Sequence, residues 1–348
     1  MRIVTRSLAV VGPVLALPLL AAQPAAAHER WFVADTPGGD WGFFFSPLPL
    51  LLVSAVVAVT LAWRWAAFRL VPTPELGVLK PLARLTPYVP RLLAIHLGVS
   101  LLALAATGDF LAHSLALRSV PGGQAVGLLE AALGVWFITG VRLRPAAVAL
   151  SLLGPLALLA GGPVAVLESA HLLGVAVFVA LLPPSDGTFG RVDLDLARLR
   201  PALLALRLGA GTALVTLAFS EKFTNPELAR ATLAHYPALN VADTIGISLS
   251  NDTFTAVAGA TELLFGLLVL SGALPQVAVL VAAVPFNATL LLFGQTELVG
   301  HLPVYGIFLA LIVYGSDAAT AGAVRWLPSP SLLRHVSRRR DGVPLPLG

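Results

Sequence analysis

Carboxylate and imidazole side chains recur at helical spacing inside apolar stretches of this 348-residue chain. Glu168 precedes His171 by three residues and Glu297 precedes His301 by four, so each pair falls on one face of a helix. Histidine exchanges protons near neutral pH, and glutamate can relay them or ligate a metal. If the surrounding segments cross a membrane, such groups are costly unless paired or hydrated, so they mark candidate functional sites.

The composition places these residues in a membrane protein. Apolar residues make up 57% of the chain and charged residues only 11%, less than half of the roughly 25% usual in soluble domains. The chain has no Cys, which excludes disulfides, iron–sulfur clusters and covalently attached c-type haem. Its net charge of +4 is spread over short loops, and no P-loop, Rossmann or hydrolase motif occurs. The composition therefore predicts a lipid bilayer as partner and no nucleic acid.

The N-terminus has the form of a secretory signal. Arg2 and Arg6 precede an apolar run, and the small residues at 25–27 provide a cleavage motif before His28. We expect a signal peptide at 1–27, with His28 as the new N-terminus. An uncleaved anchor helix is the alternative.

Nine later segments are apolar enough to span a membrane. They are 46–63, 91–108, 123–141, 145–161, 165–183, 202–219, 254–272, 275–293 and 299–315.

The distribution of basic residues predicts the orientation of these spans. If residue 28 lies outside, only four basic residues fall in outer segments, namely Arg30, Arg118, Lys222 and Arg230. The inner loops and tail then hold 15, which satisfies the positive-inside rule: Arg64, Arg69, Lys80, Arg84, Arg91, Arg142, Arg144, Arg191, Arg198, Arg200, Arg325, Arg334, Arg338, Arg339 and Arg340. We expect a multi-pass protein of a bacterial plasma membrane, with the N-terminus outside and the C-terminus in the cytoplasm. The strong preference for Arg over Lys favours a bacterial source.

Two parts of the chain resemble each other. Residues 90–98 align with 201–209, and 129–134 with 261–266, while the two Glu/His pairs correspond. Four spans per copy give a parallel repeat. The predicted fold is an all-α polytopic transmembrane bundle, a leading helix followed by two four-helix units. The predicted divisions are 1–27 signal peptide, 28–89 N-terminal segment with the first span and a cytoplasmic loop, 90–185 first unit, 186–200 linker, 201–317 second unit and 318–348 basic tail.

The second copy resembles the DoxX superfamily of four-helix membrane proteins. The resemblance rests on Arg207, Gly209, Lys222, the segment 262–266 and Glu297. In the first copy His96 replaces Arg207 and Asp109 lies near the place of Lys222. The resemblance implies a quinone-linked oxidoreductase subunit, or a small subunit that assembles with a redox or stress-defence enzyme or another electron-transfer partner.

The polar residues within or beside the spans gather near the predicted outer face, one cluster in each copy. Three interpretations are open. The first is structural pairing between helices, in which Lys222 pairs with Glu262 or Glu297. The second is a quinone pocket in which His171 or His301 binds a carbonyl and the adjacent Glu relays protons, and the third is a di-iron centre of two Glu and two Glu/His pairs. The quinone and proton-relay candidates are Glu130, Glu168, His171, Arg207, Lys222, Glu262, Glu297 and His301.

A separate hypothesis concerns copper. A free amino group and imidazole at His28 would chelate Cu(II), with His113 or His235 as a further ligand and Asp109 one helical turn from His113. The leading expectation is a redox-associated membrane subunit with quinone as its cofactor, and the sequence leaves open whether it is itself an enzyme. The alternatives are a non-enzymatic scaffold or transport component, or a membrane protein that binds copper or iron.

Overall fold

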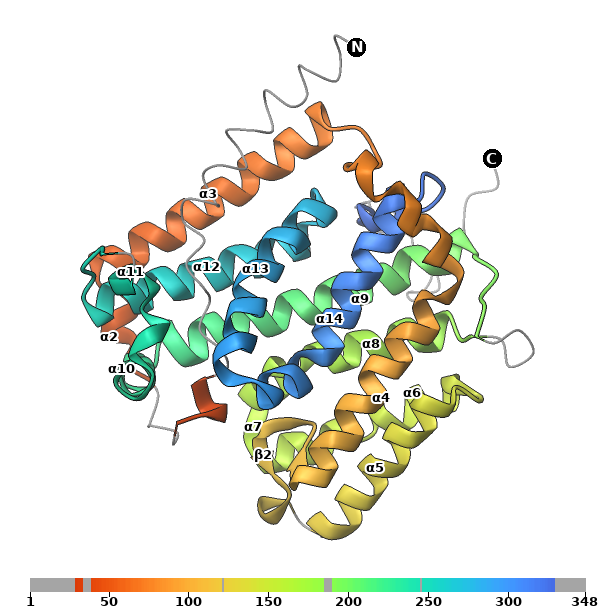
Figure 1. Ribbon diagram of the computed structural model, residues 1–348, viewed down its shortest axis with the longest axis horizontal. Helices are drawn as coiled ribbons and strands as arrows, with labels where there is room; N and C mark the ends of the chain where they lie inside the picture. Colours follow the sequence, from red (N-terminus) through yellow and green to blue (C-terminus); the bar gives the residue numbers. More distant parts are fainter. Residues whose placement is uncertain (1–28, 34–38, 121, 185–189, 245, 329–348) are drawn as a thin grey trace, which may run out of the picture.

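The computed structural model describes residues 29–33, 39–120, 122–184, 190–244 and 246–328. The predicted signal peptide, His28 and most of the basic tail lie outside these ranges. The described chain is an all-α polytopic bundle with a single two-stranded hairpin (Figure 1). The α-helices are α2 (Trp41–Phe44), α3 (Pro47–Leu70), α4 (Val89–Thr107), α5 (Gly123–Thr139), α6 (Leu143–Ser151), α7 (Gly154–Glu168), α8 (Ala170–Leu181), α9 (Leu196–Leu217), α10 (Pro226–His235), α11 (Val241–Thr244), α12 (Asn251–Ser271), α13 (Pro275–Phe293), α14 (Gln295–Ser316) and α15 (Ala321–Val324).

Shorter elements complete the fold. The strands β1 (Asp109–Phe110) and β2 (Ala112–Ala116) pair antiparallel. Four segments are 3-10 helices: η1 (Glu29–Trp31), η2 (Gly77–Tyr88), η3 (Leu117–Ser119) and η5 (Pro237–Leu239). A π-helical segment, η4 (Ala218–Phe223), continues α9.

The expectation of nine continuous spans needs correction. In the described ranges six helical segments are long and apolar enough to cross a membrane: Pro47–Leu70, Gly77–Thr107, Leu196–Phe223, Asn251–Ser271, Pro275–Phe293 and Gln295–Ser316. The pair α6 and α7, bent by 45°, would make a seventh, and α5 and α8 are shorter apolar helices.

The predicted spans 145–161 and 165–183 are not continuous helices. The chain bends between α6 and α7, and Gly162 inside α7 has φ 74° and ψ −175° directly before Pro163. Proline lacks an amide donor and clashes with the preceding turn, whereas glycine alone accepts this backbone conformation. A further break at Ser169 leaves α8 with only 12 residues. Hydropathy found the apolar segments but not these breaks.

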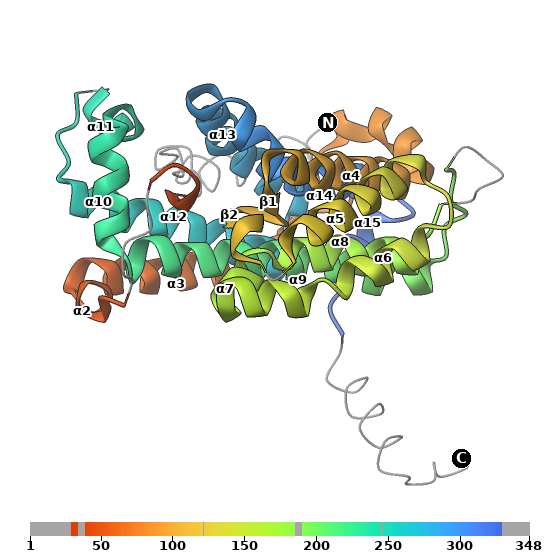
Figure 2. The ribbon, with the colours of Figure 1, turned by 90° about the horizontal axis from the view of Figure 1, so that it is seen from below.

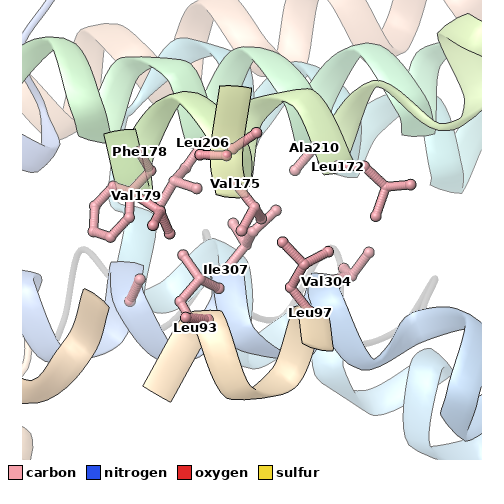
Figure 3. Packing of buried hydrophobic residues seen from close by; sticks show 14 of the residues in the cluster. Leu93, Leu97, Leu172, Val175, Phe178, Val179, Leu206, Ala210, Val304 and Ile307 are labelled. Atoms are coloured by element: carbon pink, nitrogen blue, oxygen red, sulfur yellow. The ribbon is translucent and has the colours of Figure 1, made fainter. Parts of the chain in front are cut away.

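Four helices form the centre of the bundle. The helix α8 packs along α9, and α14 packs along α4. In Figure 3 Leu93 and Leu97 of α4 and Ile307 of α14 face Val175 of α8 and Leu206 of α9 across this core. Within each half, further helix pairs correspond. The helix α4 packs on α5 as α9 packs on α12, and α6 packs on α8 as α13 packs on α14. The leading helix α3 lies along α12 (Figure 1) and keeps many apolar side chains exposed, as a lipid-facing helix does.

Glycines allow the central helices to approach closely. An added Cβ at Gly98 would lie 2.6 Å from the Gly134 carbonyl oxygen, and one at Gly209 would lie 2.7 Å from that of Ala170. Small residues at such crossings let helix backbones pack tightly in lipid.

We expect Gly209→Ala to lower the free energy of unfolding by about 1–3 kcal/mol, because the added methyl group meets backbone rather than a movable side chain. Unfolding in mixed detergent micelles measures the change. Gly154→Ala is the matched control, since nothing lies within 4 Å of its added Cβ. Equal stability of the two variants would show that the α8–α9 crossing is not tight.

Arginines link α9 to α12 and α4 to α5. Arg207 is fully buried and donates to the carbonyl oxygens of Val269 and Leu270, which end α12. Arg91 donates in the same way to Phe137 and Ile138 at the end of α5. Arg91 thus makes contacts of the same kind as Arg207, although the sequence alignment pairs Arg207 with His96.

Candidate functional site

A buried lysine with three carboxylates forms the centre of the polar region. Lys222 Nζ lies 3.2 Å from Glu262 Oε1, 3.6 Å from Glu29 Oε1 and 3.7 Å from Glu221 Oε2. The Lys222 side chain is fully buried, and the carboxylates come from η1, η4 and α12. The π-helical turn buries both Glu221 and Lys222 although they are consecutive. Local π-helices frequently accompany functional sites. We call these four residues the Lys222 centre.

The charges of the Lys222 centre do not balance. With every carboxyl group ionised, three negative charges would face one positive charge in a buried environment, which is unfavourable. The second oxygens, Glu29 Oε2, Glu221 Oε1 and Glu262 Oε2, are buried and have no hydrogen-bond partner among the described residues. Each of these second oxygens can therefore carry a proton without breaking a hydrogen bond to a described residue. The arrangement can therefore hold protons and exchange them.

The segment 29–32, which we call the strap, covers this centre. Glu29 donates its backbone N–H to Glu221 Oε2 at 2.9 Å, and Arg30 forms an ion pair with Glu168. Figure 2 shows its short helix η1 between α10 and β2, both of which it contacts.

Aromatic contacts anchor the second half of the strap. The Trp31 ring lies 5.2 Å from the His113 ring and 5.0 Å from the His301 ring, between centroids. Phe32 stacks on Phe293 with centroids 4.0 Å apart. Successive residues of the strap thus contact different elements of the bundle.

The pair Glu297 and His301 is formed as expected. His301 Nδ1 lies 3.2 Å from Glu297 Oε1, which also accepts a hydrogen bond from Thr289 Oγ1 at 2.6 Å. The supposed counterpart differs, because Glu168 pairs with Arg30 and accepts from Ser220 Oγ at 2.6 Å rather than bonding His171. The break at Ser169 separates α7 from α8 and removes the common helical face. His171 is buried in α8.

Asp109 and His113 meet on a hairpin and not on a helix. The helix α4 ends at Thr107, and Gly108 turns the chain with φ 85°. His113 Nδ1 lies 2.6 Å from Asp109 Oδ2. Glu130 of α5 accepts the backbone N–H of Leu111 at 2.9 Å and so holds the hairpin tip.

The two polar clusters expected from the repeat are one arrangement. Trp31 lies against His113 of the first copy and His301 of the second, and Arg30 contacts Glu168 and the Ser220 carbonyl oxygen, again from different copies. Sequence reasoning missed Glu29, Arg30 and Trp31 as site residues. The available signal was the run of polar and aromatic residues at 29–31, close to the predicted cleavage site. Arg207 lies about 22 Å from Lys222 along the helix, at 1.5 Å per residue, so it does not belong to this site.

The structure limits the metal hypotheses. Among the described residues, no group of three or more His, Asp or Glu side chains is arranged to hold a metal ion. The di-iron arrangement is not formed, since Glu130 binds the hairpin and Glu168 binds Arg30. His28 lies outside the described residues. His235 is exposed on α10, and its ring lies 6.2 Å from that of Tyr236.

A pocket of about 400 Å³ opens beside the strap. Arg30, Glu168 and Ser220 line it on the polar side, and Ala160 and Val164 of α7 line it on the apolar side. Exposed leucines on α7 place this helix at the lipid-facing surface. The pocket therefore joins an apolar wall to hydrogen-bonding groups next to the Lys222 centre.

Comparison with known proteins adds no relative: no protein-family model, no curated protein and no solved structure matches this chain.

Docking of the strap should depend on pH through Glu29, which lies outside the spanning segments. Burial raises the pKa of Glu29 to about 7, although Lys222 opposes the rise. A carboxyl group with a raised pKa binds its proton more tightly when docked, so docking weakens as pH rises from about 4.5 through about 7. Hydrogen-exchange protection factors of 29–33 should fall over this interval in the wild type.

The Glu29→Gln variant is the control for this prediction, because its uncharged side chain does not titrate. Its protection factors should stay constant across the same interval. A wild-type profile as flat as that of the variant would contradict the assignment to Glu29.

Proposed function

We propose that this protein is a redox-associated membrane subunit that binds a lipid-soluble quinone in the pocket at Glu168 and exchanges protons with it. The observation that carries the proposal is the pocket itself. Its apolar wall belongs to a lipid-facing helix, and its polar wall presents Glu168, Ser220 and Arg30. Such a pocket suits a molecule that arrives from the bilayer and carries oxygen atoms on its headgroup.

The proposed chemistry follows from the neighbours of the pocket. A quinone takes up two electrons and two protons to become a quinol, and we assign the electrons to a redox partner. The Ser220 hydroxyl donates its single hydrogen to Glu168 Oε1 at 2.6 Å and so orients that carboxylate at the pocket wall. Glu221, the next residue, belongs to the Lys222 centre, which can supply or receive protons. The pocket and the proton-holding residues are therefore adjacent along the chain and in space.

The proposal includes membership of the DoxX superfamily as two four-helix units after a leading helix. The matching helix pairings of the two halves support this division. It also includes a bacterial plasma membrane, a cleaved signal peptide, and an outer location for the strap and the Lys222 centre. The excess of basic residues in the opposite loops supports that orientation.

Quinone binding by the purified protein in nanodiscs tests the proposal. With a short-tailed benzoquinone as titrant, we expect Glu168→Gln and Ser220→Ala each to weaken binding about 10-fold, the effect of losing roughly 1.4 kcal/mol. Glu227→Gln is the matched control, because Glu227 is an exposed carboxylate paired with Arg230 outside the pocket. Absence of saturable binding by the wild type, or unchanged binding by both pocket variants, would refute the proposal.

A further inference from the structure

The polar wall of the pocket contains a charged side chain from outside the two four-helix units. Arg30 belongs to the strap, and its side chain is 17% exposed while that of its partner Glu168 is 6% exposed. Arg30 Nη2 also donates to the Ser220 carbonyl oxygen at 3.1 Å. The guanidinium group therefore contacts both Glu168 and Ser220 in the pocket wall.

Neighbouring residues of the strap fix this position. On one side Glu29 contacts Lys222 and Glu221. On the other side the Trp31 ring lies against Gly300. A Cβ added to Gly300 would lie only 2.2 Å from this ring. Phe32 then stacks on Phe293. These anchors hold Arg30 in the pocket wall, and they must loosen if Arg30 is to move.

We propose that Arg30 recognises the ligand headgroup, and that the strap must shift so that its guanidinium passes from Glu168 to the ligand. This inference rests on the proposed quinone pocket and names the residue that selects its ligand. A guanidinium presents a planar fork of donors, which matches oxygen acceptors such as quinone carbonyls. The ligand class is therefore a lipid-soluble molecule with acceptor oxygens on its headgroup, not an apolar hydrocarbon.

The transfer of Arg30 also changes Glu168. Once the guanidinium turns to the ligand, Glu168 keeps Ser220 Oγ as a partner but loses its cation. One movement therefore changes the partners of both the ligand headgroup and Glu168.

Substitution of Arg30 tests the recognition step. In nanodiscs, Arg30→Gln should weaken binding of a decyl-substituted benzoquinone at least 10-fold and leave partitioning of decylbenzene unchanged. The quinone affinity of Arg30→Lys should lie between those of the wild type and Arg30→Gln. Arg230→Gln is the matched control, since Arg230 pairs with Asp252 and Glu227 on the exposed outer surface. Wild-type quinone affinity in Arg30→Gln would overturn the assignment.

A cross-link tests the movement without altering Arg30 or Glu168. The natural chain has no Cys, so Phe32→Cys with Phe293→Cys provides the only two thiols. A short thiol cross-linker that dithiothreitol cleaves should abolish quinone binding, and cleavage should restore it. Each single Cys variant controls for modification alone.

The outcomes of the cross-link experiment separate the two proposals. Equal quinone binding before and after cleavage overturns the strap movement while the pocket assignment stands. Absence of binding after cleavage, together with absence in the wild type, overturns the pocket assignment itself. The cross-link result remains decisive if Arg30→Gln fails to fold.

Discussion

Replacing Lys222 by Met should lower the free energy of unfolding by about 3–5 kcal/mol, the range for removing one partner of a buried ion pair. Lys222 is the cation within 4 Å of Glu29, Glu221 and Glu262. Without it, three buried carboxyl groups must either become neutral or repel one another. The strap should also detach. Glu29 loses its ion pair with Lys222, and the Glu221 carboxylate, which accepts the backbone N–H of Glu29, changes position.

Thermal unfolding in detergent and hydrogen exchange of 29–33 measure the two effects. The matched control is Lys80→Met, a change at the only other lysine, which is exposed in η2. The double variant Lys222→Met with Glu262→Gln should recover part of the lost stability, since it removes one of the stranded carboxylates. If Lys222→Met unfolds at the same temperature as Lys80→Met, the Lys222 centre is not the electrostatic core of the site.

Replacing Arg207 by Met should lower the free energy of unfolding by about 3 kcal/mol or more, because buried carbonyl groups would lose a charged donor. Arg207 donates at 2.7–3.1 Å to the carbonyl oxygens of Val269, Leu270, Val324 and Trp326. It therefore ties α9 to the ends of α12 and α15. Unlike the change at Lys222, this one should leave hydrogen exchange of the strap unaltered, since Arg207 lies about 22 Å from Lys222 along the helix.

Arg198→Met is the control on the same helix. Arg198 is 62% exposed and pairs only with Asp195, at 3.5 Å, among the described residues. Thermal unfolding of both variants in one detergent gives the comparison. A loss in Arg207→Met no larger than that in Arg198→Met would show that the four carbonyl groups find other donors.

The sequence indicated every apolar segment but not the continuity of each helix. Segments 202–219, 254–272 and 275–293 became α9, α12 and α13 with nearly the expected bounds. Segment 145–161 is interrupted by the 45° bend between α6 and α7, and segment 165–183 is interrupted at Ser169. Hydropathy averages over a window, so it registers apolar character and overlooks a local change of direction.

Spacing along a helix predicted contacts only where the helix was unbroken. Glu297 and His301 lie on the continuous helix α14 and meet. Glu168 and His171 span the break at Ser169, and Glu168 turns to Arg30 instead. Asp109 and His113 do meet, but across a hairpin whose turn places them together for a different reason.

By itself the amino-acid sequence determined that the protein lies in a lipid bilayer, because so few charged residues cannot cover a water-soluble surface. It also determined which polar residues lie within apolar segments and therefore need partners there. Only the tertiary structure decided their partners. Lys222 meets Glu29 across more than 190 residues of chain, and Trp31 contacts histidines from both copies. Such contacts depend on how helices cross and where the strap lies, and neither hydropathy nor helical periodicity encodes distances between separate elements.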